Sequence, residues 1–537
     1  MPRFAPKPIV LAVAMALALA ACGGDDEPTA PYAGAFDVGE LDTTMDPCVD
    51  VGAFVNNRWQ AAHPIPADKS FVSTLQVLQD QSDALQREIL ENAAAGVDTA
   101  PANSIERKLG LLYRAGLDEA ALDAAGVQPV ASALARVDQL QSPTDIAAYL
   151  TERAAQGQSA VLDVAPLQDY LDPHMMIAAV SPAALALPTP AHYSEPDYAD
   201  IVQAYRDYLR TLLTLAGEDA ASAARQADWA LALETRLAAV SPSPEELAHP
   251  DTWYAPVSVQ EANRITPHFD WYAFLAGQGL APATFSLIAQ PYFAEFDRML
   301  LDVPAEQWRA YLRLQVLDGA ATLLSRPFRD AYFAFYRRTL AGVQTPVPRW
   351  RAVLNDINGV MSEALGQLYV ARAFPPEARA RAERVVQDVK AAMRERLRNV
   401  AWMTDATRRQ AVDKLDKMQT LVGYPDAWPD WSQAVVSDEG YYASIASLNA
   451  FNHRRLLARI GKPPQPGIWD FPPQKVNAFY DPQVNSINFP AAIVQPPFFS
   501  PDADPALNFG GLGSVAGHEM THAFDPNGSL FDGDGRR

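Results

Sequence analysis

Cysteine is almost absent from this chain: among 537 residues, only Cys22 and Cys48 carry a thiol. Two cysteines cannot build the disulfide framework of a small secreted domain, and they are too few for a zinc site made of thiolates. Positive charge is also scarce, with 43 lysines and arginines against 64 acidic residues and a net charge of −21. Because such a chain repels polyanions, we expect no nucleic-acid partner.

A hydrophobic run long enough to cross a bilayer is missing as well. The apolar stretch of residues 9–21 has thirteen residues, whereas a spanning helix needs about 20. It follows Arg3 and Lys7 and ends in small residues, which is the pattern of a secretory signal. Residues 19–22, LAAC, resemble the box at which bacterial lipoproteins receive their lipid. We therefore expect residues 1–22 to be a lipoprotein signal peptide and Cys22 to be lipidated, with a plain signal peptide and a chance cysteine as the alternative.

The expected lipid anchor sets the compartment. Gly23, rather than an aspartate, follows the cysteine, which by resemblance to the known sorting rule favours the outer membrane. We expect a protein of the bacterial cell envelope that meets the membrane only through this anchor. If Cys22 carries lipid, Cys48 has no partner for a disulfide within the chain.

The rest of the sequence divides by composition. Residues 23–44 are polar and rich in glycine, proline and aspartate, which predicts a flexible tether. Residues 45–430 show mostly helical periodicity; in residues 382–400, for example, an apolar residue recurs every four positions with charge on the opposite face. Residues 431–475 are dense in proline and tryptophan and predict an irregular connection between two lobes.

The pattern changes near the end of the chain. Residues 476–480 and 484–489 predict two short β-strands, with Asp-Pro-Gln as the turn between them. Residues 510–524, GGLGSVAGHEMTHAF, predict a helix that is ended by the turn signal DPNG. A small β element is therefore expected beside a helix that carries two histidines.

His518, Glu519 and His522 on this helix have the spacing of a metallopeptidase motif. Histidines at i and i+4 lie on one face of a helix and can share a Zn²⁺ at about 2.0–2.1 Å each. A glutamate beside the first histidine can take a proton from water at the metal without being a ligand. The alternative is a pair of histidines on a solvated helix face. Burial of this otherwise apolar helix makes unpartnered histidines costly and favours the zinc site.

Two histidines are not a complete catalytic site, which usually has three protein ligands and a water. In one class of zinc proteases the third ligand is a histidine six residues after the second, but that position is Gly528. Asp532 and Asp534 remain possible ligands. Asp525 is either a helix-end residue or a partner that orients a histidine.

Six segments resemble, in order, the neprilysin and endothelin-converting-enzyme family of zinc endopeptidases, including its bacterial oligopeptidases. They are DPCVDVGAFVNNRW, KLGLLYRAGLDEAALDAAGVQPV, PVPRWRAVLNDINGVMSEALGQLYVARAF, WMTDATRRQAVDKLDKMQTLVGYPDAW, VNAFYDPQVNSINFPAAIVQPPFF and GHEMTHAFDPNGSLFDGDG. The likeness runs from about residue 46 to the last residue. Departures are Val51 and Gly52, where aromatic residues are common in the family, and Asn56, where animal members have cysteine.

The resemblance implies roles for individual residues. His518 and His522 would hold one Zn²⁺ per chain, and Glu519 would be the catalytic base. Asn477 and Ala478 match the family's N-A-x-Y segment, which binds the substrate backbone. The family's third ligand is a glutamate in a later E-N-x-x-D block, which this sequence does not reach. We therefore expect a C-terminally truncated chain in which residues 476–537 are the start of the zinc domain.

These observations predict a mainly α-helical, two-lobed metallopeptidase with a small β element next to the zinc helix. In the family, the lobes enclose a chamber that admits peptides and excludes folded proteins. The predicted function is zinc-dependent hydrolysis of internal peptide bonds in oligopeptides. The alternative is a catalytically inactive truncated homologue that at most binds peptides, because the third zinc ligand is missing.

Overall fold

A computed structural model of the protein describes residues 38–537, apart from residues 466, 468 and 470. The expected signal peptide and Cys22 lie outside the described residues. Within the described part, no helix combines the length and the apolar character that crossing a bilayer would require. Cys48 is exposed and forms no disulfide within residues 38–537, which contain no other cysteine.

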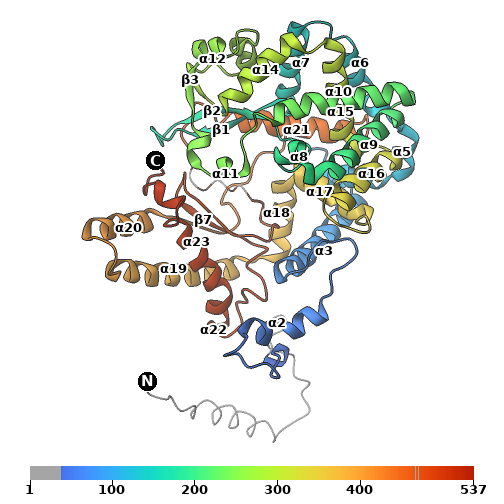
Figure 1. Ribbon diagram of the computed structural model, residues 1–537. Helices are drawn as coiled ribbons and strands as arrows, with labels where there is room; N and C mark the ends of the chain where they lie inside the picture. The colour runs from blue at the N-terminus through green and yellow to red at the C-terminus, as the bar shows by residue number, and fades with distance from the viewer. Residues whose placement is uncertain (1–37, 466, 468, 470) are drawn as a thin grey trace, which may run out of the picture.

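The described chain forms two lobes, each around its own apolar core (Figure 1). The core of the upper lobe takes its residues from between Val130 and Phe335, with Leu457 added from a later helix. The core of the lower lobe joins residues before this stretch, such as Leu90, to residues after it, such as Met520. The upper lobe is thus inserted between two parts of the lower one. The predicted domain boundaries stay predictions.

Helices make up most of both lobes. Those of the upper lobe are α6 (Ala131–Asp138), α7 (Pro143–Ala155), α8 (Ala191–Ser194), α9 (Ala199–Leu215), α10 (Ala220–Ala238), α11 (Pro244–Leu247), α12 (Val259–Ile265), α13 (Trp271–Gly277), α14 (Gln290–Asp302), α15 (Ala305–Ala320) and α16 (Arg326–Tyr332). Those of the lower lobe are α3 (Thr74–Ala95), α4 (Ile105–Leu117), α5 (Glu119–Ala125), α17 (Arg349–Val360), α18 (Ser362–Ala373), α19 (Pro376–Asn399), α20 (Asp405–Lys417), α22 (Pro505–Asn508) and α23 (Ser514–His522). The helix α2 (Val51–Ala62) buries no residue and lies apart, at the bottom of Figure 1.

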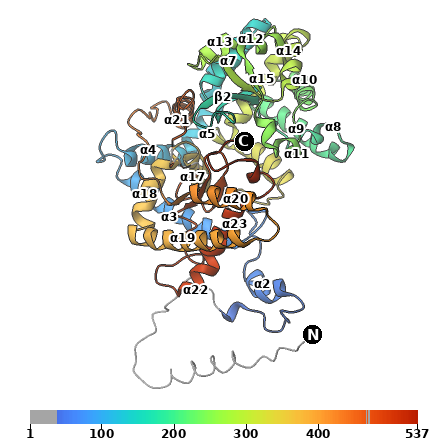
Figure 2. The same ribbon diagram turned by 90° about the vertical axis from the view of Figure 1, so that its left-hand side faces the viewer.

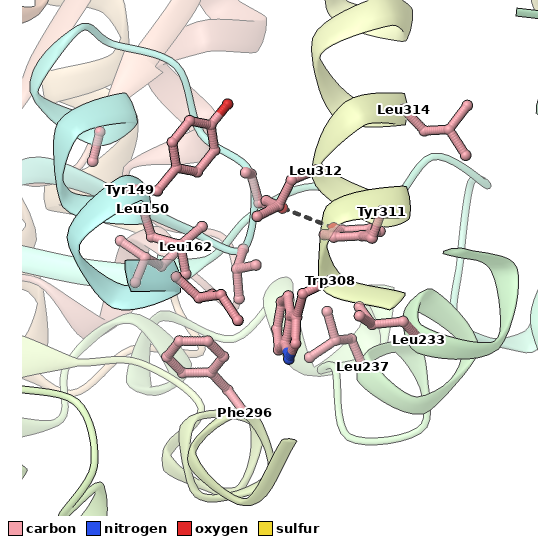
Figure 3. Close-up of a cluster of buried hydrophobic side chains, with 14 of the residues drawn as sticks. Tyr149, Leu150, Leu162, Leu233, Leu237, Phe296, Trp308, Tyr311, Leu312 and Leu314 are labelled. Atoms are coloured by element: carbon pink, nitrogen blue, oxygen red, sulfur yellow. Dashed lines mark hydrogen bonds between the residues drawn. The ribbon is translucent and has the colours of Figure 1, made fainter. Parts of the chain in front are cut away.

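Trp308 of α15 lies in the core of the upper lobe (Figure 3). Its fully buried ring meets Phe296 of α14 edge to face, with 6.1 Å between centroids. The indole N–H donates to the carbonyl of Met299 at 3.2 Å, so burial leaves no polar group unpaired. Loss of such a buried side chain typically costs about 3–5 kcal/mol, which makes this contact one of the anchors of the upper lobe.

One helix joins the two cores. α21 (Tyr441–Leu457) begins with Tyr441 in the lower core and ends with Leu457 in the upper core. The expectation of an irregular connection over residues 431–475 is therefore wrong for this helix of 17 residues. Because its apolar residues contribute to two different cores, they do not form the single stripe from which a helix is predicted.

The helix expected over residues 382–400 is present as α19. Val385 and Val389 of the predicted apolar face pack partly buried against the lower core. Val386 and Lys390, each one residue further along, are more deeply buried than these two valines. Lys390 is accommodated there because its Nζ donates to the carbonyl of Met418 at 2.7 Å. A lysine can thus occupy a core position when its ammonium finds a buried acceptor.

Each lobe holds one small sheet. In the upper lobe the strand order is β1 (Leu162–Gln168), β2 (Met176–Pro182), β4 (Thr284–Leu287) and β3 (Pro256–Ser258), and the β2–β4 pair is parallel. In the lower lobe the order is β5 (Gln419–Gly423), β7 (Ser486–Pro490) and β6 (Phe479–Asp481). The strand β7 pairs in parallel with β5 and antiparallel with β6. The lower sheet is the predicted β element, although both of its predicted strands begin a few residues later, whereas the upper sheet was not predicted.

One face of the helix that carries the two histidines packs against these lower-lobe elements. His518 is exposed and His522 is half-buried, so the burial that the sequence predicted for this helix does not extend to its histidines. α23 contacts β6 and β7 as well as α19, and Figures 1 and 2 both show it close to α19. The predicted fold class, mainly α-helical and two-lobed with a small β element next to this helix, is confirmed.

Candidate metal centre

α23 is introduced by a π-helical turn. It has no side-chain cap and continues instead from the turn Phe509–Gly513. Within this turn, the backbone N–H of Leu512 donates to the carbonyl of Phe498 at 2.7 Å. Gly511 permits the approach, because a Cβ there would lie 2.2 Å from the same carbonyl oxygen. Such turns often occur at functional sites, and this one fixes the start of α23 against the preceding segment.

His518 and His522 lie one turn apart on α23 and direct their Nε2 atoms toward each other. The two Nε2 atoms are 3.1 Å apart, and the ring planes are inclined by 88°. Two nitrogens that bind one Zn²⁺ tetrahedrally at about 2.0–2.1 Å are about 3.3 Å apart. The separation therefore fits a shared cation, and it also suits one N–H···N hydrogen bond between the rings.

Asp525 holds the other side of the His522 ring. Its Oδ2 lies 2.8 Å from His522 Nδ1, and its Oδ1 accepts the backbone N–H groups of Asn527 at 2.9 Å and Gly528 at 2.7 Å. Burial alone would raise the pKa of Asp525, but the hydrogen bonds from the Gly528 N–H and from His522 lower it below its usual range. A carboxylate on Nδ1 leaves Nε2 available to a metal, and such partners are common around metal-bound histidines.

Glu519 is the buried member of the site, with 6% of its surface exposed. Burial raises the pKa of this carboxyl, and positive charge on His518 or His522 would act in the opposite direction. One of its oxygens and one nitrogen of each histidine all lie within 4.8 Å of one another. A carboxylate with a raised pKa beside metal ligands has the properties of a general base.

These three residues fit a Zn²⁺ site. Imidazole is a preferred zinc ligand, and the possible ligand atoms of the three side chains point to one place. Within the described residues, no third histidine or carboxylate joins the three. Asp534 pairs instead with Lys417 at 2.8 Å. Asp532 Oδ1 accepts the backbone N–H groups of Asp534 and Arg536, each at 2.9 Å. In this arrangement neither aspartate completes the site, which has two of the three protein ligands that a catalytic zinc normally has.

Asn477 and Ala478 lie directly before β6, not within it, and both are half-buried. Ala478 packs against the lower core. β6 is an edge strand of its sheet, paired only with β7 in a register that sets Phe479 opposite Asn488. An extended peptide can add to such an edge through main-chain hydrogen bonds. Because α23 contacts β6, a peptide paired there would run near the histidine helix, while the substrate-binding role of Asn477 and Ala478 stays a prediction.

Two cavities lie near but not at this site. One of about 470 Å³ is bounded by α3, α17 and residues 471–475, with Asp83 and Arg351 in its wall. A second of about 220 Å³ lies between the lobes against β1, β5 and β7. Neither wall includes α23. The cavities therefore do not help to locate the reaction site, which is inferred from the side chains of α23 alone.

Two residues that fix the turn after α23, Lys414 and Gly528, were not predicted from the sequence to have this role. A Cβ on Gly528 would lie 1.8 Å from the carbonyl oxygen of His522, so the chain folds back tightly onto the last turn of the helix. Lys414 Nζ donates to the carbonyls of Gly528 at 2.6 Å and Phe531 at 2.7 Å. The turn signal DPNG could have pointed to Gly528. No sequence signal pairs Lys414 with a residue 114 positions away.

Sequence comparisons place this site in a known family. Two family models described as peptidase family M13 match residues 47–425 and residues 477–537. Among curated relatives, neprilysin-3 of Drosophila melanogaster is 26% identical over 523 residues, and endothelin-converting enzyme 1 of Mus musculus is 27% identical over 523 residues. Each alignment covers 92% of this chain and 66% of the relative, so the chain spans just under two thirds of their length.

Solved structures agree with this assignment. The zinc metalloprotease ZMP1 of Mycobacterium tuberculosis, crystallised with an inhibitor, superposes with a TM-score of 0.88 at 33% identity, over 93% of this chain and 76% of that one. PEPO from Lactobacillus rhamnosis superposes with a TM-score of 0.84 at 26% identity, over 91% of this chain and 77% of that one. The resemblance predicted from the six sequence segments is confirmed.

Proposed function

The chain belongs to peptidase family M13, and from this membership and the geometry of α23 we propose that it is a zinc-dependent endopeptidase. The proposed reaction is hydrolysis of internal peptide bonds in oligopeptides. One observation carries the proposal: the Nε2 atoms of His518 and His522 lie 3.1 Å apart, with buried Glu519 beside them. These residue types at this spacing suit one Zn²⁺ and a general base.

The residues of the chain would divide the work as follows. His518 and His522 hold the ion, and Asp525 keeps the His522 ring in place through Nδ1. When bound there, Zn²⁺ would supply Lewis acidity toward the scissile carbonyl and toward the attacking water. Glu519 takes the proton from that water and passes it to the leaving amine.

Substrate selection would rest on the strand edge and on the two lobes. The outer edge of the half-buried strand β6 would align an extended peptide, with Asn477 and Ala478 contacting its main chain. An extended segment is available in an oligopeptide but not in a folded protein. The two lobes would add to this restriction if they enclose a chamber that admits peptides and excludes folded proteins, as the resemblance to the family implies.

A second candidate function is peptide binding without turnover. It is favoured by the ligand count, since within the described residues the site offers two imidazoles and no third ligand beyond Glu519. Loss of a ligand weakens zinc binding and lowers activity steeply. Reading the coding DNA past codon 537 for an in-frame E-N-x-x-D block separates a fragment of an active enzyme from an inactive homologue.

We further propose that the protein is a lipoprotein of the cell envelope, anchored through Cys22. The apolar run of residues 9–21 and the LAAC box support this location. Mass spectrometry of the mature N-terminus tests it. A lipid-modified residue 22 is expected, whereas an unmodified cysteine or cleavage elsewhere would contradict the anchor.

Cleavage of an internally quenched oligopeptide tests the enzyme proposal. Zinc-dependent cleavage that is blocked by a chelator and abolished by Glu519→Gln is expected. The same variant should still bind zinc, because Glu519 is not assigned as a ligand. Peptide binding that neither zinc nor a chelator affects, without any cleavage, would favour the binding function and contradict the endopeptidase.

A further inference from the structure

Lys414 on α20 is a buried lysine whose partners all belong to the surroundings of α23. Only 5% of its surface is exposed. Its Nζ donates to the carbonyl oxygens of Gly528 at 2.6 Å and Phe531 at 2.7 Å. Burial lowers the pKa of this ammonium to about 8, and the charges of Asp532 and Asp525 act against that shift. Because a buried charge is costly unless it is hydrogen-bonded, these two carbonyls are strongly held.

The first of these carbonyls belongs to the turn that presents Asp525 to His522. The N–H of Gly528 donates to Asp525 Oδ1 at 2.7 Å, and Asp525 Oδ2 meets His522 Nδ1 at 2.8 Å. Gly528 also lies so close to the carbonyl of His522 that no side chain would fit. Lys414 therefore holds a turn that contacts His522 in two ways. The Asp525 side chain of this turn meets the His522 ring, and the Gly528 backbone lies against the His522 carbonyl.

The same lysine is also tied to the edge strand. Its backbone carbonyl accepts Asn485 Nδ2 at 2.9 Å, and the same amide donates to the carbonyl of Gly533 at 3.0 Å. The hydroxyl of Tyr480, in β6, donates to Asn485 Oδ1 at 3.1 Å. The ammonium lies 5.8 Å from the centroid of the Tyr480 ring, within the range of a cation–π contact.

We propose that Lys414 is a positioning residue for the metal centre: it fixes the turn of residues 525–531 so that Asp525 orients His522, and it sets that turn against β6. The inference rests on the proposed zinc function. It differs from a role in stability alone, because a lysine that only stabilised the lobe would not alter how tightly the histidines hold a metal.

Two other lysines of the chain provide matched controls. Lys390 of α19 is similarly buried and donates to the carbonyl of Met418, the residue that follows α20, at 2.7 Å, so it contacts neither the turn of residues 525–531 nor α23 through this bond. Lys417 lies on the same helix as Lys414 but is partly exposed and pairs with Asp534 at the surface. Lys390→Met therefore controls for the loss of a buried ammonium as such. Lys417→Met controls for the loss of a positive charge next to the C-terminal segment that contains Asp534.

The test compares thermal stability and Zn²⁺ affinity of the full chain, the affinity being measured by competition with a chromogenic chelator. Lys414→Met and Lys390→Met are both expected to lower the melting temperature. Only Lys414→Met should weaken Zn²⁺ binding, by about 10–100-fold as for other groups that orient metal ligands. Lys414→Arg keeps the charge and the N–H donors, and it should bind Zn²⁺ within a few-fold of the unchanged chain. Lys417→Met should change neither quantity appreciably.

The NMR signals of the histidine rings give a second reading, independent of Zn²⁺ affinity. With ¹⁵N-labelled histidine, the Nδ1 signal of His522 should move in Lys414→Met and not in Lys390→Met, even before zinc is added. Equal zinc affinities and equal histidine spectra in these two variants would overturn the inference while leaving the zinc proposal intact. Absence of zinc binding by the unchanged chain would instead sink the proposed function. If Lys414→Met does not fold, Lys414→Gln replaces it, with the same two readings.

Discussion

Asp525 Oδ2 lies 2.8 Å from Nδ1 of His522, three residues earlier in the chain. This contact makes Asp525 the nearest carboxylate partner of a proposed zinc ligand. Asp525→Ala should therefore weaken Zn²⁺ binding by about 10–100-fold, as removal of such partners commonly does. Isothermal titration with Zn²⁺ measures the change.

Asp534→Ala is the control for this prediction. Asp534 belongs to the same segment but pairs at the surface with Lys417, and surface pairs contribute little. Unchanged zinc affinity is expected for it. If Asp525→Ala also bound Zn²⁺ like the unchanged chain, the orienting role of Asp525 would be wrong.

Gly511 and Gly510 form a natural pair for testing the π-turn before α23. A Cβ on Gly511 would meet the carbonyl oxygen of Phe498 at 2.2 Å, whereas a Cβ on Gly510 would meet nothing within 4 Å. Gly511→Ala should lower the free energy of unfolding by roughly 1–3 kcal/mol through overpacking. Gly510→Ala should leave it unchanged or raise it by about 0.5–1 kcal/mol, because alanine loses less backbone entropy in a helix. Urea unfolding measures both, and equal effects would contradict the close approach.

Because Asp356 has a raised pKa in the lower lobe, we expect the free energy of unfolding to depend on pH. Burial raises its pKa to about 6, and the hydroxyl of Tyr441 donates to it at 2.7 Å. Between an unfolded pKa of 3.8 and about 6, the folded chain holds a proton that the unfolded chain has released. This carboxyl therefore makes the free energy of unfolding fall as pH rises through that window, by at most about 3 kcal/mol.

Asp356→Asn isolates this contribution, because an amide of the same shape does not titrate. The difference in unfolding free energy between the unchanged chain and the variant should shift between pH 4 and pH 6.5 and be flat above. Urea unfolding at several pH values gives this difference. A difference that stays constant across the window would show that Asp356 titrates normally.

The parts of the site that the sequence predicted are those close together in the chain. His518, Glu519 and His522 occupy little more than one helical turn, so spacing alone brings them together. Asp525 was named by the same reasoning as either a helix-end residue or a partner that orients a histidine, and it lies 2.8 Å from His522 Nδ1. Lys414 was not, because a charged residue on an amphipathic helix ordinarily faces solvent; only the fold of the lower lobe brings it under Gly528.

The fold shows the same division. α19 was predictable because its apolar residues recur with the helical period. The upper sheet was not, because strands such as β2 are buried on alternating and adjacent positions alike and show no clean period of two. α21 was missed because its ends serve two different cores, so its apolar residues do not form one stripe.

X-ray absorption at the zinc edge tests the central claim most directly, since it reports the atoms around the metal. The chain loaded with one equivalent of Zn²⁺ should show two histidine nitrogens at about 2.0–2.1 Å. This signature should vanish when His518 and His522 are both replaced by alanine. A zinc environment that contains no histidine nitrogen, or that is the same in the double variant, would contradict a metal centre on α23.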